Sequence, residues 1–221
     1  MKTQKACLSI VLALGLTTAM VHGTEIFNFA NIAGASIQFN GTASSFQFNA
    51  SSGNEWAITT ESAGSDAVGL VGTFGGGPWT YGAISGSLVQ SATVNTAPAT
   101  LAINDGAGHL ATANISWVDV TTYGGTGYLN VNAVLNLSNL AYSGANPDLL
   151  SFFSAPTGDL TLSFQFNPAM SLTQLTAGSG PYLTSFSGSL TSVPEPGTML
   201  LAGLGGGLLL LLRSRRQASR N

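Results

Sequence analysis

Two long stretches of this chain alternate between apolar and polar residues, and this alternation is the feature that most limits the fold. In residues 129–138 the odd-numbered positions are apolar, and in residues 160–167 the even-numbered positions are apolar. A shorter run of the same kind covers Ala111–Trp117. Because successive side chains of a strand point to opposite faces, the pattern predicts antiparallel strands with one buried face. It therefore favours a packed β fold over the disorder that many Ser, Thr, Asn and Gly residues would allow.

Shorter segments between turn signals bring the prediction to about ten strands. These segments are Glu25–Asn31, Ser36–Asn40, Ser45–Asn49, Trp56–Thr60, Val68–Phe74, Trp79–Ile84, Ser87–Val94 and Tyr182–Leu190. Asn104-Asp105-Gly106 predicts the turn of a hairpin, and Asn146 followed by Pro147 predicts a helix that runs to Phe153. The expected fold is all-β, either a β-sandwich or a jelly roll.

The pattern Ser-x-Gln-Phe-Asn occurs at residues 36–40, 45–49 and 163–167. The spacing of the copies is irregular, so a solenoid is not expected. Strands of this composition converge on Ser and Gln outside and Phe inside, which explains the similarity without a repeat. The first two copies are close enough in sequence to form a hairpin of adjacent strands.

Charge is distributed unevenly along the chain. All six Lys and Arg residues lie near the two ends, so residues 24–192 contain none. That stretch contains eight carboxylates: Glu25, Glu55, Glu61, Asp66, Asp105, Asp119, Asp148 and Asp159. A surface without Lys or Arg cannot neutralise phosphates, which argues against nucleic-acid binding. Apolar burial and backbone hydrogen bonds must stabilise such a fold, because salt bridges to Lys or Arg are absent.

Residues 1–23 have the features of a secretory signal peptide. Two lysines precede an apolar run from Ala6 to Leu16, and Val21-His22-Gly23 places small residues near a cleavage site. The mature chain is expected to begin near Thr24. Cys7 is the single cysteine and lies within this peptide, so the mature chain has no thiol for a disulfide, a metal site or nucleophilic catalysis.

The chain ends in three consecutive segments of contrasting chemistry. Val193–Thr198 contains a Pro-Glu-Pro box, residues 198–212 are almost all Met, Leu, Ala or Gly, and residues 213–221 are rich in arginine. The apolar segment predicts a transmembrane helix, because backbone groups in hydrocarbon must be hydrogen-bonded within the segment. Its length as a helix is roughly 22 Å, short against a hydrocarbon core of about 30 Å. The arginines expected to stay on the cytoplasmic side are Arg213, Arg215 and Arg216.

These three segments, in this order, resemble the PEP-CTERM sorting signal of exported bacterial proteins. The resemblance implies a substrate of an exosortase, a membrane transpeptidase, with a recognition box formed by Val193, Pro194, Glu195 and Pro196. It also implies export by the Sec translocon and a precursor anchored in the inner membrane by its C-terminal helix. Transfer to the cell surface or extracellular matrix would follow. Such systems are associated with exopolysaccharide, which is therefore an implied partner. The resemblance covers the chain ends and leaves the ectodomain, residues 24–192, without a family.

The ectodomain contains no complete catalytic or metal-binding motif. His109 is not accompanied by a Gly-x-Ser-x-Gly elbow, and Asn104–Gly106 supplies one carboxylate where a calcium loop needs several. We therefore expect a non-enzymatic surface or biofilm-matrix protein without cofactor, metal or catalytic residues. A secreted glycoside hydrolase or esterase using Glu55 and Asp119 is one alternative.

Aromatic residues support a second alternative, a carbohydrate-binding module that acts in the same matrix. Trp79 and Tyr81 follow the glycine loop Gly75–Gly77. Aromatic residues next to loops are more often exposed than those inside strands. Exposed rings could stack on sugar rings, so these two are the expected carbohydrate contacts.

Overall fold

The computed structural model describes residues 24–95, 97–123 and 131–193. The strands in these ranges are β1 Ile26–Asn31, β2 Ser36–Asn40, β3 Ser45–Asn49, β4 Trp56–Glu61, β5 Val71–Gly75, β6 Trp79–Thr80, β7 Val89–Thr93, β8 Ala99–Asn104, β9 Leu110–Trp117, β10 Asp119–Tyr123, β11 Val131–Ala141, β12 Thr157–Phe164, β13 Tyr182–Thr184 and β14 Phe186–Val193. The helices are α2 Pro147–Phe153 and α3 Leu172–Ala177.

The predicted signal peptide, residues 1–23, and the predicted membrane segment, residues 198–212, lie outside the described residues. Within the described ranges, no helix is both long enough and apolar enough to cross a membrane.

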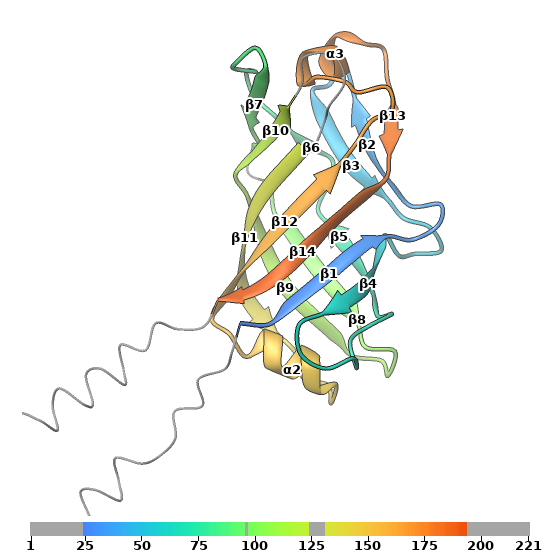
Figure 1. Ribbon diagram of the computed structural model, residues 1–221, viewed down its shortest axis with the longest axis vertical. Coiled ribbons are helices and arrows are strands. Elements are labelled where there is room, and N and C mark those ends of the chain that lie inside the picture. Colours follow the sequence, from blue (N-terminus) through green and yellow to red (C-terminus); the bar gives the residue numbers. More distant parts are fainter. Residues whose placement is uncertain (1–23, 96, 124–130, 194–221) are drawn as a thin grey trace, which may run out of the picture. The chain divides into compact units, whose positions relative to one another are not determined.

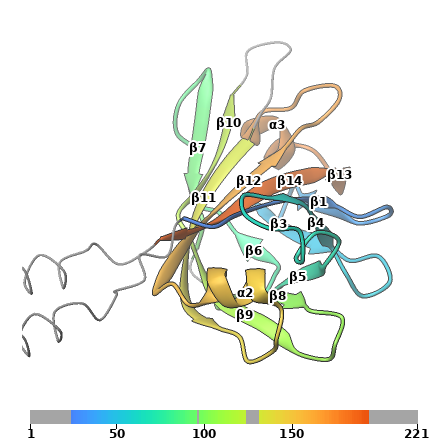
Figure 2. The same ribbon diagram turned by 60° about the horizontal axis from the view of Figure 1, so that its bottom comes forward.

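Eight antiparallel strands close into a barrel. Their order is β12-β14-β1-β4-β5-β8-β9-β11, and β11 pairs with β12 to complete the circle. The closing pair extends from Val131 opposite Phe164 to Leu137 opposite Gly158. The strands run obliquely around a common interior (Figures 1 and 2). The all-β prediction is confirmed, but the expected sandwich or jelly roll is wrong, because the sheet closes on itself instead of packing on a second layer of equal extent.

A smaller sheet, in the order β13-β2-β3-β6, packs against the aromatic interior of the barrel. Aromatic contacts join the two sheets, and three of them have ring centroids 4.9 Å apart: Phe39 with Phe164, Phe46 with Trp117, and Phe48 with Phe186. β2 and β3 pair from Ser36 opposite Asn49 to Asn40 opposite Ser45. This confirms the hairpin predicted from the two neighbouring Ser-x-Gln-Phe-Asn copies.

The predicted strand Tyr182–Leu190 is divided at Ser185. Its first part is β13, which pairs with β2 in the smaller sheet, and its second part is β14, which lies in the barrel between β1 and β12. One chain segment thus connects the two sheets.

The interior is filled by large side chains. Trp56, Trp79, Phe29 and Phe46 are all at most 2% exposed. Along β9, exposed and buried residues alternate over the whole strand, as the sequence pattern predicts. The apolar face of β9 therefore belongs to the core and its polar face to the outer wall.

The two helices lie at opposite ends of the barrel (Figure 1). Asn146 is the N-cap of α2, and its side-chain oxygen accepts hydrogen bonds from the N–H groups of Asp148 at 3.1 Å and Leu149 at 3.0 Å. The predicted helix and its cap are confirmed. Phe152 anchors α2 by stacking on Phe27, with ring centroids 4.9 Å apart.

The sequence analysis missed α3. A capping box begins this helix, with Ser171 accepting from the Gln174 N–H and Gln174 accepting from the Ser171 N–H. The pattern Ser-x-x-Gln before an apolar residue was the signal that could have predicted it.

Candidate functional site

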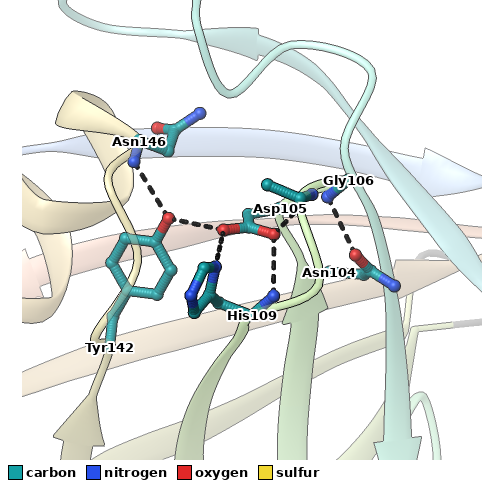
Figure 3. A network of polar contacts seen from close by, with 7 residues as sticks. Asn104, Asp105, Gly106, His109, Tyr142 and Asn146 are labelled. Carbon is teal, nitrogen blue, oxygen red and sulfur yellow. Dashed lines mark hydrogen bonds and ion pairs between the residues drawn. The ribbon is translucent and has the colours of Figure 1, made fainter.

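Asp105, at the turn of the β8–β9 hairpin, is the centre of a polar network that reaches the start of α2 (Figure 3). Its Oδ1 accepts hydrogen bonds from the N–H groups of Ala107 at 2.8 Å and His109 at 3.0 Å. Its Oδ2 accepts from the Tyr142 hydroxyl at 2.9 Å and lies 3.1 Å from His109 Nδ1. The Tyr142 hydroxyl in turn accepts from the Asn146 N–H at 2.9 Å. The network therefore ties the hairpin turn to the N-cap of α2.

These contacts account for the acidity of Asp105. Desolvation raises the pKa of its carboxyl, but hydrogen bonds from the N–H groups of His109 and Ala107 and from the Tyr142 side chain outweigh it and lower the pKa to about 2. Desolvation, with the neighbouring Asp105 charge, raises the pKa of the Tyr142 hydroxyl. Both carboxylate oxygens of Asp105 already accept hydrogen bonds from other groups of the protein. This arrangement suits a structural role better than that of a general base.

The hairpin predicted at Asn104–Gly106 is confirmed, because Asn104 pairs with Leu110 across the turn. The Asn104 side chain accepts from the Gly106 N–H at 2.8 Å, so both side-chain oxygen ligands of the turn bond to its own backbone. In the part of the chain that the structure describes, no group of three or more His, Cys, Asp or Glu is arranged to hold a metal ion.

The carboxylates of Glu25, Glu61 and Asp148 interact electrostatically where α2 meets the β4–β5 loop. Asp148 Oδ2 accepts from the N–H groups of Asp66 at 2.7 Å and Ala67 at 3.2 Å. Burial raises the pKa of the Glu61 carboxyl to about 7, with further contributions from the charges of Asp148 and Glu25. Sequence reasoning missed this cluster, because residues far apart in the chain meet only in the folded barrel.

The two acids expected for a hydrolase have separate partners. Glu55 Oε2 accepts from the Phe74 N–H at 2.6 Å, and burial raises the pKa of this carboxyl to about 7. Asp119 Oδ2 accepts from the Ser91 hydroxyl at 3.0 Å. Glu55, the residue before β4, thus contacts β5, whereas Asp119 links β10 to β7. Each of these two hydrogen bonds is therefore suited to holding neighbouring strands together.

Trp79 and Tyr81 are 1% and 4% exposed, so the expectation that their rings face solvent is wrong. The reason is the pairing of β6 with β3, which places Trp79 opposite Phe46 on the inward face. The Tyr81 hydroxyl lies 3.0 Å from Thr176 Oγ1 on α3. Carbohydrate contact by these two residues stays a prediction, and their burial weighs against stacking on a sugar.

An open hollow of about 260 Å³ lies beside the glycine loop, and Gln47 borders it. Its other lining residues are Phe48, Phe74, Gly76, Gly77 and Trp79.

Amide side chains continue from Gln47 over the outer face of β2 and β3. The Gln47 amide donates to Asn49 Oδ1 at 3.1 Å, the Asn49 amide to Gln38 Oε1 at 2.9 Å, and the Gln38 amide to Asn40 Oδ1 at 2.7 Å. We call Gln38, Asn40, Gln47 and Asn49 the amide row. The Ser-x-Gln-Phe-Asn copies contain all four residues, but the sequence analysis interpreted them as packing alone.

Comparison with known protein families identifies the C-terminal part of the chain. Residues 192–216 are a PEP-CTERM protein-sorting motif. The resemblance inferred from the sequence is confirmed, and the match leaves the family of the barrel open. No curated protein and no solved structure matches the chain. The PEP-CTERM motif implies processing by an exosortase and an exported protein of the cell envelope or surface.

The PEP-CTERM motif overlaps the last strand of the barrel, β14. Its first two residues, Ser192 and Val193, are the last of β14, and Val193 lies opposite Thr157 of β12. The Ser192 N–H donates to the Glu25 carbonyl at 2.8 Å, and Ser192 Oγ accepts from the Glu25 N–H at 2.7 Å. The remaining residues of the predicted box and the predicted basic end lie outside the described residues.

Proposed function

We propose that this protein is a non-enzymatic structural component of an exopolysaccharide-containing biofilm matrix. The observation that carries the proposal is the PEP-CTERM motif at residues 192–216, which continues directly from the last strand of a barrel with a densely packed interior. The sorting motif directs the protein to the surface, and the packed aromatic core gives the barrel the stability that a domain displayed there needs.

The contacts of the acidic residues support a structural role. Asp148 accepts from the Asp66 N–H of the β4–β5 loop and Glu55 from the Phe74 N–H of β5. Asp105 accepts from two N–H groups of its own turn and from the distant Tyr142 hydroxyl. Such bonds are roughly twice as strong as neutral ones, and here they replace the salt bridges that a body without Lys or Arg cannot form. The carboxylates are thus used to join parts of the fold.

The proposed route begins with Sec-dependent export and removal of residues 1–23. Residues 198–212 then anchor the precursor in the inner membrane, with Arg213, Arg215 and Arg216 on the cytoplasmic side. Exosortase processing at Val193–Pro196 transfers the barrel to the surface or the matrix.

The test compares the intact protein with a variant that lacks residues 194–221, both expressed in the native host. Membrane, matrix and medium fractions are separated, and the protein in each is quantified and weighed by mass spectrometry. We expect the product of the full-length gene in the matrix with a processed C-terminus. The shortened variant is expected in the medium. An intact protein that stays in the membrane and still ends at Asn221 would contradict the proposal.

A second candidate function, carbohydrate binding, is favoured by the amide row and the adjoining hollow. Side-chain amides both donate and accept, as hydroxyl groups require. The described body contains no Lys or Arg, so a neutral polysaccharide fits this face better than an anionic one.

The probes are a neutral glucan and a polyuronate, each tested against the processed protein. We expect binding of the glucan alone, and at least tenfold weaker binding in the double variant Gln38→Ala, Gln47→Ala. Asn114→Ala is the matched control, because Asn114 is an exposed amide on β9. Equal binding by the double variant and the control would exclude the amide row. Polymer turnover that is lost in Glu55→Gln would instead indicate a hydrolase.

A further inference from the structure

The C-terminal end of β14 pairs with a neighbouring strand on each side. On one side it pairs with β12 as far as Thr157 opposite Val193, and on the other it pairs with β1 as far as Ile26 opposite Thr191. The Glu25–Ser192 hydrogen bonds extend the pairing with β1 by one further residue. Ser192 is 2% exposed, whereas Val193 is 37% exposed. The barrel therefore buries the first residue of the PEP-CTERM motif and leaves the second partly exposed.

This arrangement limits what a processing enzyme can reach. A protease that binds its substrate as an extended chain uses the same backbone N–H and C=O groups that β14 uses within the sheet. Before Val193, these groups already pair with two neighbouring strands, so binding there would require β14 to leave the barrel. Pro194 has no N–H and cannot continue the hydrogen-bond ladder.

We propose that Ser192 is a positioning residue for exosortase processing, because its two hydrogen bonds with Glu25 set the first peptide bond that the enzyme can reach, Val193–Pro194. The proposal rests on the proposed function, in that it assumes exosortase processing of this chain. It adds that the folded barrel, and not the sorting box alone, determines the N-terminal limit of the cut.

The reaction breaks one peptide bond at or after this limit. The new C-terminal acyl group passes to water or to an acceptor hydroxyl or amine, and the tail leaves as an amine that takes up the proton. The barrel keeps β14 complete in every permitted product.

The same hydrogen-bonded pair lies beside the expected N-terminus. Thr24 is exposed and precedes Glu25, so signal-peptide removal after Gly23 leaves Glu25 in place to bind Ser192. Ser62 supports Glu25 from the other side, because its hydroxyl donates to Glu25 Oε1 at 3.1 Å and accepts from the Ile26 N–H at 2.9 Å. The first and last residues of the mature ectodomain are thus joined by one local set of hydrogen bonds.

The experiment measures the C-terminal residue of the full-length gene product after processing in the native host, by intact mass and C-terminal peptide sequencing. Four chains are compared: wild type, Ser192→Ala, Ser192→Thr and Ser189→Ala. Ser192→Ala removes the hydroxyl acceptor of the Glu25 N–H, and Ser192→Thr restores it. Ser189→Ala is the matched control, since its hydroxyl also makes a side-chain hydrogen bond within the sheet, to Thr161 Oγ1 at 2.6 Å.

Wild type, Ser192→Thr and Ser189→Ala are expected to end at Val193 or later in every molecule. Ser192→Ala is expected to give an additional population, a tenth of the molecules or more, that ends within residues 187–192. A purely structural role for Ser192 would lower the melting temperature without changing the C-terminal residue, which overturns the proposal. Wild-type molecules that end before Val193 also overturn it while leaving exosortase sorting intact. Molecules that all end at Asn221 would instead overturn the proposed function, and this proposal with it.

Discussion

One helix lies at each end of the barrel, and the polar contacts at the two ends differ in charge. At the α2 end, Asp105 accepts hydrogen bonds from N–H groups of its own turn, and Asp148 accepts from N–H groups of the β4–β5 loop. At the α3 end, the first helical N–H groups bond to neutral side chains, Leu172 to Thr122 Oγ1 at 3.2 Å and Thr173 to Gln90 Oε1 at 2.9 Å. The Tyr81–Thr176 contact at this end is also uncharged.

This difference shows how a body without Lys or Arg can use charge for stability. The carboxylates at the α2 end are stabilised by backbone dipoles instead of cations. The hydrogen bonds to these carboxylates are stronger when the carboxyl group is ionised. The amide and hydroxyl groups at the α3 end do not change their charge near neutral pH. The α2 end should therefore respond to pH and the α3 end should not.

The largest effect is expected from the apolar anchors, which should be equally insensitive to pH at both ends. Phe152→Ala at α2 is expected to lower the free energy of unfolding by about 3–5 kcal/mol, and Leu175→Ala at α3 by about 2–5 kcal/mol. Both side chains are fully buried. Urea unfolding at pH 5 and pH 8 measures this. A loss that differs between the two pH values at either anchor would show that the apolar contacts are coupled to the carboxylates.

The polar anchors should separate the two ends. Asp148→Ala leaves the Asp66 and Ala67 N–H groups without their acceptor, which should cost about 1–3 kcal/mol. The matched change at the other end is Thr122→Val, which leaves one buried N–H, that of Leu172, unpaired instead of two and should cost about 1 kcal/mol, the lower end of that range. Urea unfolding at pH 7 compares them. A greater loss for Thr122→Val would contradict the comparison.

Part of the pH dependence near neutrality should come from Glu61 at the α2 end. The folded-state pKa of Glu61 is about 7, above its usual value of 4.5, so the folded protein binds the proton more tightly than the unfolded chain. Stability should therefore fall as pH rises from about 4.5 to 7 and then level off. Glu55, with a pKa also raised to about 7, adds to the same slope from the β4–β5 pair.

Glu61→Gln should reduce this slope, and Glu55→Gln should remove much of the remainder. Hydrogen exchange of the Ala67 N–H, corrected for its intrinsic rate, should become faster with rising pH in the wild type but not in Glu61→Gln. Exchange of the Leu172 N–H at the α3 end is the internal control. A pH-dependent change at Leu172 of equal size would remove the distinction between the ends.

The smallest effect is expected at acid pH. The pKa of Asp105 is lowered from 3.8 to about 2, so its contribution is complete above its usual pKa and is lost as pH falls from about 3.8 to 2. Asp105→Asn should flatten this acid limb of the stability curve while keeping a side chain of the same shape. Thermal unfolding between pH 2 and pH 5 measures it, and an unchanged acid limb would show that the Asp105 network contributes little.

Local patterns predicted the elements that depend on neighbouring residues. The α2 helix follows from the Asn146 cap and Pro147, the β2–β3 hairpin from two adjacent similar segments, and the β8–β9 turn from Asn104–Gly106. The PEP-CTERM motif was also recognisable, because its three segments are contiguous. The missed α3 helix had a local signal in Ser171 and Gln174 and could have been predicted in the same way.

Features that depend on distant residues could not be predicted. Alternating strands fit a sandwich and a barrel equally well, since both have one inward and one outward face per strand. The closure of β11 on β12 decided between them. Trp79 was expected on the surface from its place beside a glycine loop, but its pairing with Phe46 across β3 and β6 buries it.

The sequence by itself determined that this protein is exported, has an all-β body and carries a sorting motif at its C-terminal end. Each of these properties depends on the order of residues within one continuous segment. The tertiary structure alone decided that the sheet closes into a barrel, that Glu61 faces Asp148, and that the PEP-CTERM motif begins within β14 beside Glu25. The physical reason is that burial, proton affinity and access to a peptide bond depend on which distant segments lie side by side, and strand pairing sets this only when the barrel closes.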